Sequence, residues 1–289
     1  MIFDATLKDA LTKQLSALET HFDADCAFYF GEIHPYIIKL FRDFIEKLPG
    51  NEKRRDRFVL LLNTPGGSAE TVEKVVEIVR FHYKKEFYVV VPDFAFSAGT
   101  ILCMAADRIF MDYSSSLGPI DPQVFNGKEW VPALGYLDKV NEMLEKAKNN
   151  QLTNAEFLVL QSLDLAQLRR YEQARDLTVT LLKKWLVDYK FRDWQTHQTD
   201  PTKKGQPVTD DEKRARAEEI ARILGDNKIW HSHGRMIGPG TLTGVLRLKI
   251  DDYSQDTTLR PLVRTYNDLL TEYVAQRNYK LFMHSRNFF

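Results

Sequence analysis

The stretch from Arg57 to Val124 reads RFVLLLNTPGGSAETVEKVVEIVRFHYKKEFYVVVPDFAFSAGTILCMAADRIFMDYSSSLGPIDPQV. Two runs of apolar, partly β-branched residues, 58–62 and 87–91, are each followed by turn residues. Such runs are typical of strands that are buried on both faces of a parallel sheet. Between them, residues 69–83 repeat apolar side chains at the helical period. This stretch therefore predicts a βαβ unit.

Two short loops follow the predicted strands. Asn63 to Ser68 reads NTPGGS after the first strand, and Phe96 to Thr100 reads FSAGT after the second. The carboxyl ends of parallel strands meet at one edge of a sheet, and binding sites form there. We therefore expect the two loops to lie side by side.

The remaining chain predicts more helices than strands. Apolar periodicity, turn residues and a capping box at Thr209 give these expectations: helices at 5–22, 35–48, 137–148, 154–163, 165–189, 209–225 and 261–281, and strands at 26–30, 108–111 and 246–250. The prolines in 118–122 predict a rigid irregular turn. We interpret residues 1–289 as a single α/β domain, with a core at 1–125, a helical extension at 126–227 and a C-terminal segment at 228–289.

Composition excludes several classes of function. Forty basic and forty acidic residues cancel, so no charge excess indicates a nucleic-acid partner. No apolar run approaches the roughly 18 residues of a membrane span, and no apolar signal core opens the chain, which predicts a cytoplasmic protein. The two cysteines form no CxxC motif or His/Cys cluster, so we expect neither metal nor cofactor.

The paired loops carry the groups that acyl transfer needs. A serine nucleophile requires a nearby base, and its tetrahedral intermediate requires N–H donors for the oxyanion. Ser97 opens a predicted helix directly after a strand, and its neighbour Ala98 offers a backbone N–H. Gly67 can offer a second N–H, because glycine permits close approach, while Gly66 and Gly99 leave room for a substrate backbone. A common turn and a serine N-cap would explain each loop singly, but their combination is more specific.

The segments NTPGGS and FSAGTILCMAADRIFMDYSSSLGPIDPQ resemble the Clp-protease/crotonase superfamily. Within it, they resemble the serine dehydrogenase proteinase family, which is related to signal peptide peptidase A. The resemblance covers about residues 57–124, and a weaker similarity covers 230–250. It implies a ClpP/crotonase-like spiral of ββα units with a helical second half, assembled into homo-oligomers. It also implies Ser97 as nucleophile, with Gly67 and Ala98 as the oxyanion hole.

The resemblance leaves the general base open. Clp proteases carry a histidine in the turn that here reads GPIDP, and none stands at 118–122. Signal peptide peptidases use a downstream lysine instead, which makes Lys139 the first choice and Lys128 the second. Such a lysine must be largely neutral, which requires burial to lower its pKa. A semi-buried position for Lys139 is compatible with its neighbours Leu137 and Val140, whereas a surface lysine, kept charged by Asp138, is the alternative.

Two histidines form the rival choice of base. His231 and His233 lie in the segment WHSHG, which can fold back on the site with Asp121 as the group that orients the ring. Their structural alternative is a histidine in a polar loop or in packing. For Asp121, capping or bracing the rigid turn in which it stands is favoured over acid–base work.

Three functions fit these observations. The first is a serine peptidase that hydrolyses polypeptide through a Ser97–Lys139 dyad. The second is a catalytically degenerate binding protein that oligomerises through its helical second half. The third is a crotonase-like enzyme that uses the oxyanion hole on an acyl-CoA thioester, although that chemistry gains nothing from a serine at the helix start.

Overall fold

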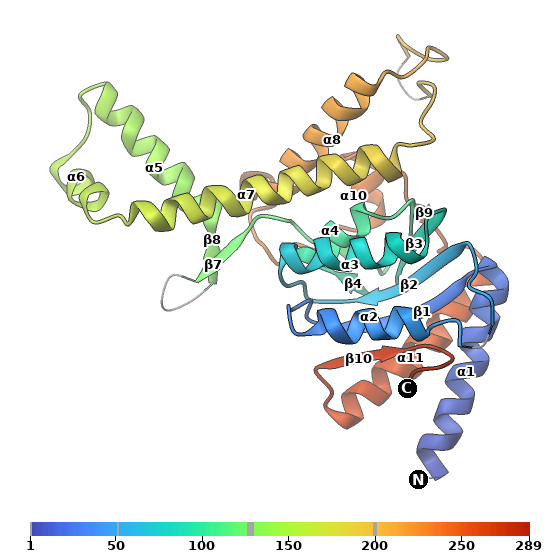
Figure 1. The fold of residues 1–289 in the computed structure, drawn as a ribbon. Helices are drawn as coiled ribbons and strands as arrows, with labels where there is room; N and C mark the ends of the chain where they lie inside the picture. Colours follow the sequence, from blue (N-terminus) through green and yellow to red (C-terminus); the bar gives the residue numbers. More distant parts are fainter. Residues whose placement is uncertain (1, 51, 126–129, 199–200) are drawn as a thin grey trace.

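The computed structural model describes residues 2–50, 52–125, 130–198 and 201–289. It is a mixed α/β structure around a six-stranded sheet of order β10-β1-β2-β3-β5-β9 (Figure 1). The sheet is parallel except that β10 runs antiparallel to β1. Its strands are β1 (Asp25–Gly31), β2 (Arg57–Asn63), β3 (Glu86–Val91), β5 (Arg108–Met111), β9 (Asp251–Asp252) and β10 (Leu281–His284).

Two smaller sheets and the helices complete the fold. The parallel pair is β4 (Phe94–Ala95) with β6 (Ser116–Leu117), and the antiparallel pair is β7 (Gln123–Phe125) with β8 (Trp130–Pro132). The helices are α1 (Ile2–Phe22), α2 (Ile37–Lys47), α3 (Ala69–His82), α4 (Ala98–Met104), α5 (Ala133–Lys148), α6 (Asn154–Gln161), α7 (Leu165–Trp185), the π-helix η1 (Leu186–Lys190), α8 (Asp210–Gly225), α9 (Asn227–Trp230), α10 (Pro239–Gly244) and α11 (Leu259–Arg277).

Helices cover both faces of the sheet. Strand β2 illustrates why, since Leu60 and Leu62 pack into the core beneath α2, α3 and α4, whereas Val59 and Leu61 pack into the core beneath α1 and α11. Successive side chains of a strand point to opposite faces, so a strand covered on both sides is apolar throughout. The unbroken runs in the sequence are the result.

The helices α5 to α8 form an outer layer and an arm. Helices α7 and α8 lie outside α3 and α4 (Figure 1). Trp185 of α7 is part of the core on this side of the sheet. The arm, which we define as α5, α6 and the first half of α7, projects away from the sheet (Figure 1). Helix α6 has no buried residue. Within the described residues, no helix has the length and apolar character needed to cross a membrane.

Most sequence expectations for the elements are confirmed. The βαβ unit is β2–α3–β3, and β5 has the bounds that the sequence predicted. The capping box at Thr209 is present at the start of α8.

Two expectations near the end of the chain are wrong. Residues 246–250 form no strand, and the helix expected to reach residue 281 ends at Arg277. Asn278 adopts a left-handed conformation with φ of 53°, which stops the helix. The chain then turns back, so that Leu281 to His284 pair with β1.

Candidate active site

The two loops lie side by side, as the sequence predicted. The N–H of Thr64 donates to the carbonyl of Phe94 at 3.0 Å, and the N–H of Phe96 donates to the carbonyl of Thr64 at 3.0 Å. These bonds extend the parallel pairing of β2 and β3 beyond the strands themselves. They hold the NTPGGS and FSAGT loops at the carboxyl edge of the sheet.

Ser97 has a strained backbone. Its φ of +50° and ψ of −114° are rare for a residue with a side chain, and such strain concentrates at functional sites. It immediately precedes α4, but its side chain makes no capping hydrogen bond. Ser68, by contrast, accepts the N–H of Thr71 and caps α3. Helix capping therefore does not account for Ser97, whose half-buried hydroxyl has no hydrogen-bond partner among the described residues.

The two glycines of NTPGGS allow this loop to lie close to Ser97 and Ile33. Gly66 has φ of +116°, and a Cβ built there would lie 2.9 Å from Cβ of Ser97. Gly67 has φ of +144°, and its Cβ would lie 2.1 Å from the carbonyl oxygen of Ile33. Ile33 bonds the carbonyl of Gly66 and the N–H of Ser68, which leaves the N–H of Gly67 outside that pair of hydrogen bonds. Only glycine fits at either position.

The start of α4 is held in place by contacts with the NTPGGS loop and with the turn at 118–122. Ala98 is the first helical residue, so its N–H has no partner within the helix. A Cβ on Gly99 would lie 2.4 Å from Cγ2 of Thr64, which explains the glycine there. Oγ1 of the buried Thr100 lies 2.9 Å from the carbonyl oxygens of Ala95 and Gly118, and accepts the Gly118 N–H at 3.0 Å. Thr100 therefore joins α4 to the irregular turn at 118–122.

We expect Gly67→Ala to lower the free energy of unfolding by about 1–3 kcal/mol, because its backbone conformation disfavours a side chain and Ile33 blocks the space. Urea unfolding measures this. Gly240→Ala is the control, since its Cβ would meet nothing within 4 Å. Equal stabilities of the two variants would contradict the strain at Gly67.

Asp121 and His233 form a partly buried pair. Oδ1 of Asp121 lies 2.8 Å from Nδ1 of His233, and its Oδ2 accepts a hydrogen bond from Gln123 at 2.8 Å. Asp121 is 1% exposed, and the side chain of His233 is 28% exposed. A carboxylate only accepts hydrogen bonds, so this contact favours the tautomer with a proton on Nδ1, in which Nε2 is the acceptor. The contact is compatible with the orienting role that the sequence suggested for Asp121, and that role stays a prediction.

Hydrogen bonds link this pair to the loop of Ser97. Leu117 and Ile237 exchange backbone hydrogen bonds of 3.0 and 2.8 Å, which pairs the segment before Asp121 with the segment after His233. Gly118 is bonded in turn to Thr100 in the first turn of α4. The segments of Ser97, Asp121 and His233 are thus joined by direct hydrogen bonds.

The other candidate bases lie elsewhere. Lys139 is on the arm, its side chain is 58% exposed, and its amine pairs with Glu142 at 3.0 Å. Of the two positions considered for Lys139, the structure therefore shows the surface one and not the semi-buried one. His231 is exposed and ends α9 in a left-handed conformation. Lys128 lies outside the described residues.

Sequence reasoning missed a polar network beneath the loops. Oδ1 of Asn63 accepts the N–H groups of Asp93 and Phe94, at 3.2 and 3.3 Å. Its Nδ2 donates to Asn267 of α11 at 2.7 Å. Arg264 of the same helix donates to Asp93 at 2.8 Å. The only sequence signal was a polar residue at the end of an apolar run, because the partners on α11 lie 204 residues away.

The described residues contain no group of three or more His, Cys, Asp or Glu side chains that could hold a metal ion. Both cysteines are buried and free, and burial raises the pKa of each thiol. Because the thiolate is the reactive form, neither cysteine is suited to act as a nucleophile.

A sequence family described as ClpP-like SDH-type serine proteinase matches residues 51–216, more than half of the chain. One uncharacterized protein of Methanocaldococcus jannaschii is 40% identical over 65 residues, which cover 22% of each chain. A second from the same organism is 33% identical over 93 residues, which cover 32% of this chain and 30% of the relative. The matches thus span less than a third of these relatives.

Solved structures give more distant similarities. Two mutant structures of 1510-N, a membrane-bound stomatin-specific protease, have TM-scores of 0.44 and 0.43 at 13% and 14% identity. Each alignment covers 79% of this chain, with 78% and 74% of the other, and the second structure holds a substrate peptide. ClpP1 from Listeria monocytogenes has a TM-score of 0.34 at 16% identity, with 57% and 77% of the chains covered.

Proposed function

This chain belongs to the family of ClpP-like SDH-type serine proteinases, and we propose that it hydrolyses polypeptide with Ser97 as nucleophile. The contact between the strained Ser97 and the Gly66–Gly67 turn carries this proposal. It sets a hydroxyl without a hydrogen-bond partner among the described residues beside a loop in which Gly67 is exposed.

The expected chemistry is acyl transfer in two steps. Oγ of Ser97 attacks the carbonyl carbon of the scissile peptide, and the N–H groups of Gly67 and Ala98 stabilise the oxyanion. The intermediate collapses to an ester on Ser97 and releases the amine. Water then attacks this ester through a second oxyanion, which frees the acid product and restores Ser97.

We infer that His233 is the general base. Its hydrogen bond to Asp121 supports this assignment, because it leaves Nε2 to take the proton of Ser97. The same nitrogen returns that proton to the departing amine and later activates water. The Ser97–Lys139 dyad is the competing assignment, with less support, because an exposed amine beside Glu142 lacks the burial that a neutral lysine needs.

We also propose that the protein is a homo-oligomer, with the arm as its interface. Three consecutive apolar residues of α6 are largely exposed: Phe157, Leu158 and Val159. Exposed apolar clusters of this kind mark protein interfaces. We expect wild type to sediment as an assembly and Leu158→Asp to shift towards monomer. Phe81→Asp on α3 is the control, because Phe81 is also a largely exposed apolar residue. A monomeric wild type would contradict the proposal.

A cytoplasmic location and the lack of a nucleic-acid partner stay predictions from the sequence.

A fluorophosphonate probe tests the peptidase proposal. We expect one covalent adduct by intact mass, and peptide mapping should assign it to Ser97. Absence of labelling at every tested pH would favour the catalytically degenerate binding protein instead. Binding of an acyl-CoA ester at these loops, without labelling, would favour the crotonase-like alternative.

A further inference from the structure

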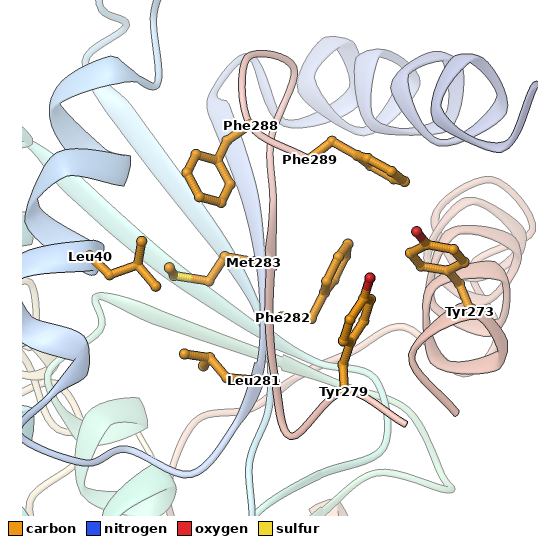
Figure 2. Close-up of a pocket in the computed structure, with 8 residues that line it drawn as sticks. All are labelled: Leu40, Tyr273, Tyr279, Leu281, Phe282, Met283, Phe288 and Phe289. Carbon is orange, nitrogen blue, oxygen red and sulfur yellow. The ribbon is translucent and has the colours of Figure 1, made fainter. Parts of the chain in front are cut away.

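A cavity of about 270 Å³ lies beside β10, and the uncharged side chains drawn in Figure 2 line it. Nothing among the described residues indicates what would cover it. A second cavity, of about 460 Å³, is lined by charged residues that pair with one another, such as Arg57 with Glu86 at 2.6 Å. Neither lining includes Ser97 or His233. The hydrogen bonds within the candidate active site are more specific than either cavity.

The carboxylate of Asp121 has a different partner on each oxygen. Oδ1 lies 2.8 Å from Nδ1 of His233, and Oδ2 accepts a hydrogen bond of 2.8 Å from Nε2 of Gln123. Asp121 is 1% exposed, and a buried charge requires hydrogen bonds to replace those of water. Among the described residues, no lysine or arginine pairs with Asp121. The amide of Gln123 is therefore the second donor that this carboxylate has.

The position of Gln123 is fixed by the ribbon of β7 and β8. Gln123 lies opposite Pro132 in this antiparallel pair, and the N–H of Ala133 donates to the carbonyl of Pro122 at 2.8 Å. The side chain of Gln123 is half-buried. Its amide nitrogen, and not its amide oxygen, faces Asp121, because a carboxylate only accepts hydrogen bonds. The ribbon thus holds a donor against Oδ2 of Asp121.

The hydrogen bond to Oδ2 restricts the rotation of the Asp121 carboxylate. The terminal torsion of an aspartate is otherwise broad, because it joins an sp³ to an sp² carbon. A donor on Oδ2 leaves Oδ1 directed at His233, where it favours the tautomer with a proton on Nδ1.

We propose that Gln123 is a positioning residue, which orients the carboxylate of Asp121 and, through it, the ring of His233. Its effect on catalysis rests on the proposed function, in which His233 is the general base. Its effect on the ring does not.

The alternative role of Gln123 is to brace the turn at 118–122. Its Nε2 also lies 3.5 Å from the backbone carbonyl oxygen of Asp121, at the limit of a hydrogen bond. A brace would contribute to the stability of the fold without changing the tautomer of His233. Gln123→Met separates the two roles, because methionine is also unbranched and of similar length but has no N–H donor. Gln276→Met, at an exposed position on α11, is the matched control.

NMR of the full chain with ¹⁵N-labelled histidine measures the tautomer directly, at a pH at which the ring is neutral. The signals of His233 are identified by their loss in His233→Ala. In wild type and in Gln276→Met they should show a protonated Nδ1 and an unprotonated Nε2. In Gln123→Met the tautomer protonated on Nε2 should gain population. An unchanged tautomer in Gln123→Met would overturn the proposal.

Peptide hydrolysis measures the consequence for the reaction. The kcat of Gln123→Met should fall by about 10- to 100-fold, because small misplacements of a catalytic group have effects of this size. KM should stay unchanged, since the hydrogen bond acts on the proton acceptor and not on the loops that bind substrate. Gln276→Met should keep the wild-type kcat, and adding Gln123→Met to His233→Ala should cause no further loss.

The outcomes separate this proposal from the proposed function. A wild-type kcat in Gln123→Met, when Ser97→Ala abolishes hydrolysis, would overturn the positioning role and leave the peptidase standing. An equal loss on adding Gln123→Met to His233→Ala would overturn it too, since Gln123 would then act independently of the ring. Hydrolysis that survives in Ser97→Ala would overturn the proposed function, and the tautomer of His233 in Gln123→Met would still decide the role of Gln123.

Discussion

Ser97→Ala should lower kcat for peptide hydrolysis by on the order of 10⁴- to 10⁶-fold, because it removes the atom that forms the acyl-enzyme. KM should change little, since the hydroxyl makes no hydrogen bond with the described residues and substrate binding rests on the loops. The positive φ strains alanine as it strains serine, so the free energy of unfolding should stay within about 0.5 kcal/mol. Hydrolysis of a fluorogenic peptide and urea unfolding measure the two effects.

Ser68→Ala is the matched control, because this serine also precedes a helix of the site. Its hydroxyl caps α3 by accepting the N–H of Thr71, so the variant should lose about 1 kcal/mol of stability. Its hydrolysis should stay within a few-fold of wild type. Hydrolysis that survives in Ser97→Ala would exclude Ser97 as the nucleophile.

The core of the fold could be predicted because local patterns determine it. A strand covered on both faces is apolar throughout, as Phe58 to Leu62 are, and the residue types alone reveal it. Strand β10 could not be predicted in this way. Its residues continue the apolar spacing of α11, and only the left-handed Asn278 ends the helix before them.

The candidate site likewise has one part whose arrangement the sequence predicts and one part whose arrangement it does not. Ser97 and the glycines of NTPGGS lie within one βαβ unit, so sequence order and the parallel topology together predict their proximity. Asp121 and His233 are 112 residues apart, and the antiparallel bridge between Leu117 and Ile237 brings their segments together. No periodicity in the sequence indicates such a bridge, and for this reason the sequence could not identify the general base.

His233→Ala should slow fluorophosphonate labelling and peptide hydrolysis by about 10²- to 10⁴-fold, the usual contribution of a general base. The ring is partly exposed, so its loss should leave the fold intact. Lys139→Ala should retain wild-type rates, because this amine is on the arm and paired with Glu142. The reverse result, with loss only in Lys139→Ala, would establish the Ser–Lys dyad.

Asp121→Asn and Asp121→Ala, each alone and combined with His233→Ala, test whether Asp121 acts by orienting the ring of His233. The amide has the size of the carboxylate, but its NH₂ group can donate to Nδ1 and so move the ring proton to Nε2. In that tautomer His233 cannot accept the proton of Ser97, and hydrolysis should fall by up to about 10⁴-fold. A variant that instead binds Nδ1 through its amide oxygen keeps the productive tautomer and should keep most activity.

Because asparagine can rotate between these states, the informative comparison is with Asp121→Ala, which removes the hydrogen bonds to both His233 and Gln123. If Asp121 acts through His233, adding either substitution to His233→Ala should cause no further loss, whereas independent packing effects would multiply.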